Sequence, residues 1–209
     1  LYFAREKKGH EGVKGTVTED FRGILVHDHE ITFYRYGSAH QECLAHVERY
    51  LKDSMENESS LTWNRRMREL LQRMIHYRKE HTGEASLDAQ TVAGFETEYQ
   101  EILDKAKEEY KRNEPSPYYR EGYNLYRRMQ EYKTEHLLFL HDMRVPTTNN
   151  TAERCLRDYK RKQTFAMTFR SLESIEELCH SKGVLLEVRK NNPNIYTAVM
   201  EIFNRRYGA

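Results

Sequence analysis

The sequence of 209 residues predicts an α/β protein that is predominantly α-helical. One β-type run, residues 23–26, ends at a His-Asp-His sequence, and its length and apolar composition are those of a strand buried on both faces. From His40 onward, apolar residues recur at helical spacing instead. We therefore expect a small sheet near the start of the chain and a helical region that makes up most of the rest.

Four helical segments are expected between the strand and an Asn-rich turn near residue 150. Apolar stripes at residues 43–51 and 61–77 mark the first two, and a charged amphipathic run over residues 88–112 marks the third. The fourth covers residues 118–143, after the break at Pro115 and Pro117. Beyond the turn, we expect an extended stretch over 163–169, a helix over 175–182 with a serine cap at Ser171 or Ser174, and a last helix over 195–206.

Composition limits the classes of function that the chain can have. The formal net charge is +1, the mean hydropathy is −0.94 and 32% of residues are charged, so a nucleic-acid surface would have to be local rather than general. Three widely spaced cysteines form no disulfide framework, which indicates reduced thiols. No apolar run approaches the roughly 18 residues of a membrane span. We expect a soluble cytoplasmic protein without a membrane partner.

Asp28 is the first candidate for a functional side chain. It directly follows the predicted strand, and α/β folds place their ligands at the carboxyl ends of their strands. The alternative is a turn aspartate that caps the next segment, and the residues alone leave both interpretations open.

Glu153 is the second candidate. Asn150 is the expected N-cap of a helix that follows Pro146, which places Glu153 at the third helical position, where a glutamate completes a capping box. The same glutamate is surrounded by cations, a setting that suits a metal ligand beside a phosphate backbone. Solvation of the helix surface is the alternative role for these cations, which are Arg154, Arg157, Lys160, Arg161 and Lys162.

Other constellations are weaker. His40, Cys43 and His46 are spaced three apart and would share a helix face, but zinc needs a fourth ligand and no second Cys/His pair occurs at finger spacing. A cysteine protease would need a residue that orients a Cys–His pair, and the sequence indicates none. Two-metal phosphoryl transfer fits better, because it requires carboxylates that are distant in sequence and close in space, as Asp28 and Glu153 would be.

Three segments resemble the insertion sequence 66 transposase family. They are residues 23–28 (GILVHD), residues 43–46 (CLAH), and residues 149–154 (NNTAER) followed by Arg157, Arg161 and Lys162. That family belongs to the DDE transposases, so the resemblance implies an RNase H-like core with a large all-helical insertion. It makes Asp28 similar to the second acid of the triad and Glu153 to the third. Cys43, His46, Asn149 and Asn150 match structural motifs of the family.

The sequence also departs from the family pattern. The first acid should lie on the first core strand, whereas the chain opens on residues 1–4, which read like the middle of a strand. Thr148 stands where the family is usually acidic, and Glu48 stands where arginine is common. We therefore expect an RNase H-like core truncated at the N-terminus. Because such a chain lacks the first catalytic acid, we expect it to be inactive on its own.

The resemblance implies an organisation and a function. Residues 1–39 would form part of the core, 40–143 the helical insertion, and 144–209 the core continuation with the third acid. The intact protein would cut DNA at transposon ends and join the ends to a target, using a pair of Mg²⁺ or Mn²⁺ ions in the bacterial cytoplasm, on the nucleoid. DNA is the expected partner, and a homo-oligomer is allowed. A non-catalytic DNA-binding remnant and a helical protein-interaction module are the alternatives.

Overall fold

The computed structural model describes residues 4–165, 171–191 and 194–207. The chain divides into two compact units. One unit is Asp20–Glu153, and the other combines Leu1–Glu19 with Arg154–Ala209. Both strands and most of the buried side chains belong to the first unit.

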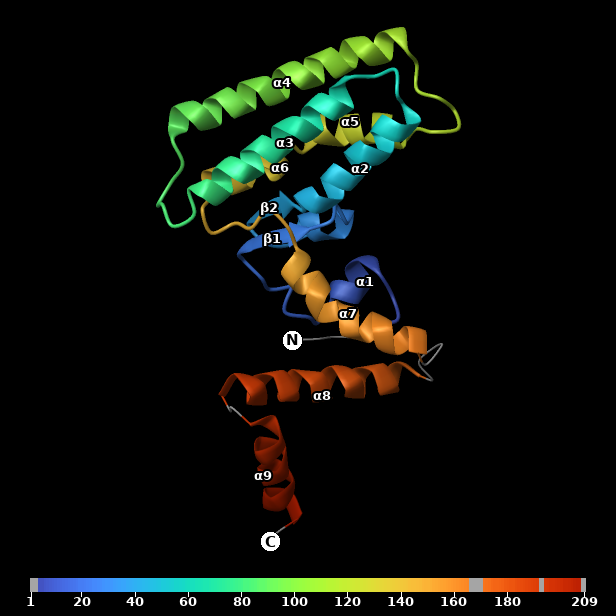
Figure 1. Cartoon of the computed structure of the whole chain (residues 1–209). Coiled ribbons are helices and arrows are strands. Elements are labelled where there is room, and N and C mark those ends of the chain that lie inside the picture. Colours follow the sequence, from blue (N-terminus) through green and yellow to red (C-terminus); the bar gives the residue numbers. More distant parts are fainter. Residues whose placement is uncertain (1–3, 166–170, 192–193, 208–209) are drawn as a thin grey trace. The chain divides into compact units, whose positions relative to one another are not determined.

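A two-stranded parallel sheet forms the base of the unit Asp20–Glu153 (Figure 1). Strand β1 is Ile24–His27 and strand β2 is Ala39–Glu42, with Ile24 opposite Ala39 and His27 opposite Glu42. The predicted strand at residues 23–26 is thus confirmed. The prediction of helix from His40 is wrong, because residues 39–42 pair with β1 and the helix starts only at Leu44.

The connection between the strands is short and compact. It contains the 3-10 helix η1, Ile31–Arg35, which begins at Glu30, whose side chain accepts a hydrogen bond from the backbone N–H of Thr32. Gly37 then adopts a φ of +74°, a conformation that glycine reaches without steric cost. This turn returns the chain to the sheet in the parallel direction.

Helices cover the sheet in two layers. Helix α2 (Leu44–Asn57), helix α5 (Glu121–Glu131) and helix α6 (Lys133–His141) lie next to the sheet, and helix α3 (Trp63–Glu80) and helix α4 (Ala89–Arg112) lie beyond them (Figure 1). Helices α3 and α4 lie side by side (Figure 1). The predicted apolar stripes supply the core, whose largest fully buried side chains include Trp63, Tyr99 and Phe139.

The expected fourth helix is divided into two. Helix α5 ends at Glu131 and α6 begins at Lys133, so Tyr132 interrupts the helix with a φ of −111° and a ψ of 36°. The ring of Tyr132 packs against His29 and Tyr34, with centroid distances of 5.0 and 4.7 Å. The break lets α6 turn onto β2, where the Gln41 side chain binds its backbone.

The second unit is helical in its described residues. It contains helix α1 (Gly9–Val13), most of helix α7 (Asn150–Phe165), helix α8 (Leu172–Asn191) and helix α9 (Ile195–Tyr207). The backbone N–H of Ser174 donates to the Ser171 hydroxyl at 3.2 Å, which confirms the serine cap. The prediction of an extended stretch over 163–169 is wrong for residues 163–165, which continue α7. The rest of that stretch lies in residues 166–170, which, like the first three residues of the chain, are outside the described ranges.

None of the described helices combines the length and the apolar composition that crossing a bilayer requires.

Candidate active site

Asp28 stands at the carboxyl end of β1 and is exposed. The next residue, His29, has a φ of 68°, which is uncommon for a residue other than glycine. Its Nδ1 lies 2.6 Å from Oε1 of the buried Glu42. This hydrogen bond holds the chain in a sharp turn directly after Asp28, so the carboxylate of Asp28 is presented at the edge of the sheet rather than drawn into a longer strand.

Cys43 joins three segments at the same edge. Its backbone N–H donates to the carbonyl of His27 at 2.7 Å, which extends the contact between the ends of β1 and β2. Its sulfur accepts a hydrogen bond from the backbone N–H of Asn149 at 3.5 Å. The backbone N–H of Leu44 donates to the carbonyl of Thr147 at 2.9 Å. The Asn-rich segment therefore lies against the start of α2, beside the strand end that carries Asp28.

Glu153 enters this region through the first turn of α7. Its backbone N–H donates to the carbonyl of Asn149 at 3.1 Å, so the helix starts at Asn150, one residue earlier than expected. Its carboxylate lies 3.5 Å from Nε2 of His46 and is 44% exposed. The capping-box alternative is therefore wrong: the side chain of Glu153 pairs with His46, in the first turn of α2.

These contacts bring the acid-bearing segments to one neighbourhood. Asp28 follows His27, Glu153 follows Asn149 by one helical turn, and both His27 and Asn149 hydrogen-bond to Cys43. Cys43 and His46, which the sequence singled out as a structural pair, thus connect the ends of β1 and α7.

The donor chemistry of this neighbourhood fits a hard divalent cation. Carboxylate oxygens are the preferred ligands of Mg²⁺ and Mn²⁺. Two polar atoms beside them, Oδ1 of Asn149 and Nδ1 of His46, are buried without a hydrogen-bond partner among the described residues. The number of ligands is smaller than a complete cage needs, since the described residues contain no group of three or more His, Cys, Asp or Glu side chains able to hold a metal.

The zinc alternative loses its geometric basis. His40 lies in β2 rather than on a helix with Cys43 and His46. Its ring packs against His27, with a centroid distance of 5.4 Å, and against Tyr34, at 4.9 Å. The three side chains therefore do not form the helix face that their spacing predicted.

A buried polar network that the sequence did not reveal lies behind the site. Glu42 is fully buried at the end of β2. Its Oε1 accepts hydrogen bonds from His29 and from the Tyr34 hydroxyl, both at 2.6 Å. Its Oε2 accepts from Arg128 Nε at 2.7 Å and from His136 Nε2 at 3.2 Å.

The surroundings of Glu42 favour its ionised form. Burial by itself would raise its pKa, but hydrogen bonds from His136 and His29 and the charge of Arg128 hold the pKa well below the ordinary value. Burial, together with the hydrogen bond to this carboxylate, raises the pKa of Tyr34. The network ties the turn after Asp28 to α5 and α6, so the helical segments hold the strand end in place.

Sequence reasoning missed this network because its members are far apart along the chain. Arg128 and His136 are 86 and 94 residues from Glu42. The available signal was a glutamate directly before the apolar Cys43 and Leu44, since an ionised side chain that is buried with such neighbours needs charged partners.

The basic residues after Glu153 lie on the same helix and belong to the second unit. All five side chains are exposed: Arg154, Arg157, Lys160, Arg161 and Lys162. Their exposure leaves them accessible to a polyanion, and it is equally typical of a solvated helix surface.

These features define an α/β protein in which the ends of parallel strands carry a polar site and long helices separate the segments that build it. The chain belongs to the IS66 transposase family: the family model described as "Transposase IS66 family" matches residues 1–177. No curated protein and no solved structure matches the chain.

Proposed function

We propose that this chain carries the catalytic region of a DDE transposase, built on an RNase H-like core. In the intact protein it would cut DNA at transposon ends and transfer the strands to a target, in the cytoplasm on the nucleoid. Membership of the transposase family supports DNA as the partner. The observation that carries the proposal is the pair of hydrogen bonds from Cys43 to His27 and from Asn149 to Cys43, which bring the Asp28 and Glu153 segments together.

In this proposal Asp28 and Glu153 are the second and third acids of the triad and the ligands that this chain gives to Mg²⁺ or Mn²⁺. Such an ion, when bound, would stabilise charge on the attacking and leaving oxygens. His46 would keep the Glu153 carboxylate turned toward the sheet edge, and the His29–Glu42 hydrogen bond would hold the turn after Asp28. These two carboxylates would not complete the coordination shell of the ion, so further ligands would be needed.

The exposed cations of α7 would bind phosphates without reading base sequence. They follow Glu153 within about three helical turns of α7. We further propose the organisation inferred from the sequence, with residues 40–143 inserted between core segments 1–39 and 144–209.

Metal binding can be tested without relying on turnover. We expect Mn²⁺ added to the isotope-labelled chain to broaden the NMR signals of residues around Asp28 and Glu153 before others. Asp28→Asn and Glu153→Gln should each weaken this effect. Asp53→Asn and Glu56→Gln, which neutralise exposed carboxylates on α2, form the matched control. Broadening that is the same in all variants would contradict the metal site.

Catalysis is tested on DNA that carries the ends of the element. With Mg²⁺, the intact protein should release free 3′-hydroxyl ends, and Glu153→Gln should abolish this product while leaving DNA binding nearly unchanged. Cleavage retained by Glu153→Gln would overturn the assignment. A protein that binds DNA in a salt-dependent manner but never cuts it with either metal would be the non-catalytic DNA-binding alternative, and one that binds neither DNA nor metal would be the interaction module.

A further inference from the structure

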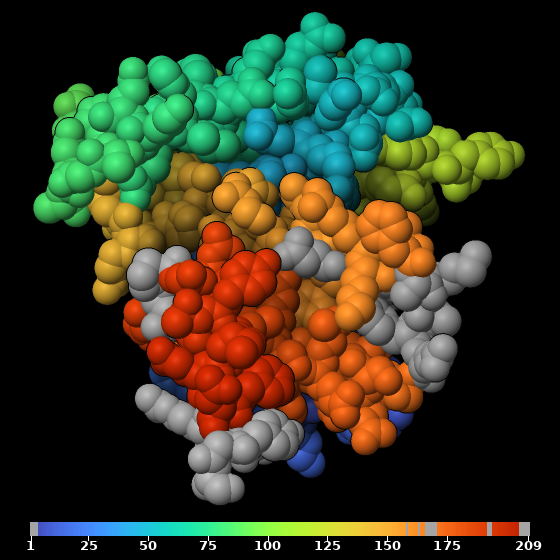
Figure 2. All heavy atoms as spheres, turned by 60° about the horizontal axis from the view of Figure 1, so that its bottom comes forward, coloured from blue at the N-terminus to red at the C-terminus, as the bar shows by residue number. Residues whose placement is uncertain are grey.

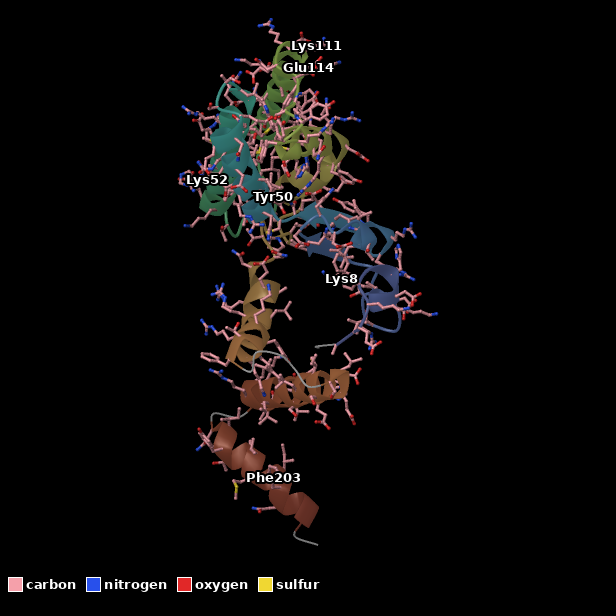
Figure 3. The ribbon with its side chains drawn as sticks, turned by 90° about the vertical axis from the view of Figure 1, so that its right-hand side faces the viewer. Lys8, Tyr50, Lys52, Lys111, Glu114 and Phe203 are labelled. Atoms are coloured by element: carbon pink, nitrogen blue, oxygen red, sulfur yellow. The ribbon has the colours of Figure 1, made fainter. Side chains whose placement is uncertain are left out.

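A second polar site lies in the helical region, away from Asp28 and Glu153 in the sequence. A groove of about 610 Å³ runs between the carboxyl-terminal part of α4 and helix α5. The loop that joins these helices stands out from the surface of the unit (Figures 1 and 2). Figure 3 shows Lys111 and Glu114 close together at the end of α4. The groove lies entirely within the unit Asp20–Glu153.

Tyrosines form the floor of the groove. The rings of Tyr110, Tyr123 and Tyr126 pack on one another, with centroid distances between 5.1 and 5.9 Å. Tyr110 and Tyr126 are buried and Tyr123 is half-buried. The hydroxyl of Tyr110 donates to the carboxylate of Glu58 at 3.1 Å, which fixes the ring. The floor is therefore rigid and aromatic, and Tyr123 offers part of its ring to a bound molecule.

Four exposed cations line the walls, opposed by one carboxylate, Glu114. Lys111 is paired with Glu108, at 2.6 Å. Within the described residues, no carboxylate lies at ion-pairing distance from the other three, which are Lys107, Arg120 and Arg127. The groove thus carries a positive charge that its own walls do not neutralise.

Helix electrostatics explain only part of this charge. Cations near the carboxyl-terminal end of a helix are stabilised by its dipole, which accounts for Lys111 in the last turn of α4. Arg120 is the N-cap residue of α5, where the dipole disfavours a cation. Arg127 projects into the same groove from α5. The dipole of α5 therefore does not stabilise Arg120, whereas a bound anion would.

We propose that this groove binds the phosphate backbone of a DNA strand. Arginine guanidinium groups bind phosphate oxygens in a bidentate manner, and cations on two walls can hold successive phosphates of one strand. Tyrosine rings suit the sugar and base surfaces that face away from the phosphates. The choice of DNA over other polyanions rests on the proposed function, whereas the affinity of the groove for phosphate does not depend on Asp28 or Glu153.

The test is DNA binding by the full 209-residue chain in the presence of EDTA. Fluorescence anisotropy of a short random-sequence duplex is measured between about 50 and 200 mM salt. The groove variant is Lys107→Gln/Arg120→Gln/Arg127→Gln. The matched control, Lys52→Gln/Lys79→Gln/Lys105→Gln, removes the same charge from exposed positions on α2, α3 and α4 outside the groove. Circular dichroism verifies that both variants are folded, as expected for exposed side chains.

If the groove contacts three phosphates, the slope of log K against log salt should become shallower by about 2.7 in the groove variant, at about 0.9 per phosphate. Its affinity at low salt should fall at least about tenfold. The control should change neither quantity by a comparable amount. Equal slopes and affinities in the two variants would overturn the inference. So would a groove variant that binds DNA like the control but loses affinity for polyglutamate, because the groove would then serve an acidic protein.

Failure of the proposed function gives a different pattern. The cleavage assay with Asp28→Asn and Glu153→Gln tests the proposed function, whereas the binding assay in EDTA involves no catalysis and no metal. A loss of binding confined to the groove variant therefore supports the groove whatever the outcome of the cleavage assay.

Discussion

The burial of His27 predicts how the stability of the protein changes with pH. This residue ends β1 and is 4% exposed, and neither ring nitrogen has a hydrogen-bond partner among the described residues. The rings of Tyr34 and His40 pack against it at 4.7 and 5.4 Å. Burial, and then the charge of the neighbouring His40, lower the pKa of His27 from 6.5 to about 4. The folded state thus keeps this histidine neutral.

The direction of the effect follows from proton binding. Below pH 6.5 the unfolded chain takes up a proton at His27 that the folded chain does not bind until about pH 4, so the free energy of unfolding falls as the pH falls. The full difference in pKa corresponds to about 3 kcal/mol. Between about pH 7.5 and 5, where most carboxylates stay ionised, the expected loss is about 2 kcal/mol.

Urea denaturation at a series of pH values measures this loss. His27→Phe removes this titrating group. On acidification across that range, the free energy of unfolding of the unmodified chain should therefore fall by about 2 kcal/mol more than that of the variant. His76→Gln, on the exposed surface of α3, is the control, because it replaces a histidine and leaves the buried ring of His27 in place. Parallel curves for the unmodified chain and His27→Phe would refute the reasoning.

Two further predictions concern stability at neutral pH, also measured by urea denaturation. Glu42→Leu should lower the free energy of unfolding by about 3–5 kcal/mol, because the nearly buried Arg128 then loses the carboxylate that pairs with it. A loss no greater than that caused by Glu56→Gln on the surface would show that the network contributes little. Gly94→Ala should raise the free energy of unfolding by about 0.5–1 kcal/mol, because nothing lies within 4 Å of the new β-carbon in α4. Gly37→Ala should lower it, because the φ of Gly37 is +74° and the β-carbon would lie 2.8 Å from a backbone oxygen. Changes of the same sign in the two variants would contradict this conformational argument.

Local sequence patterns determined much of the helical structure. The third expected helix, 88–112, is observed as α4, which starts at Ala89 because the Asp88 side chain caps its first turn. The strand at 23–26 and the serine cap of α8 were also predictable. Such features depend on residues within a few positions of one another, so a single stretch of sequence contains the information.

The candidate site was predictable in its residues and not in its contacts. The motif residues Cys43, His46 and Asn149 could be selected from the sequence, as could Asp28 and Glu153. That Glu153 contacts His46 instead of completing its own cap depends on the approach of α7 to α2. The energy difference between these two uses of a carboxylate is small, so local sequence does not decide between them.

Tertiary structure alone decided the remaining features. Residues 39–42 form a strand because β1 lies beside them, although the residues that follow have helical spacing. The helix from 118 breaks at Tyr132 because its ring packs on His29 and Tyr34. Glu42 finds Arg128 and His136 from 86 and 94 residues away. Burial makes an unpaired charge or hydrogen-bonding group costly, and the partner that removes this cost is set by the fold, which brings distant segments together.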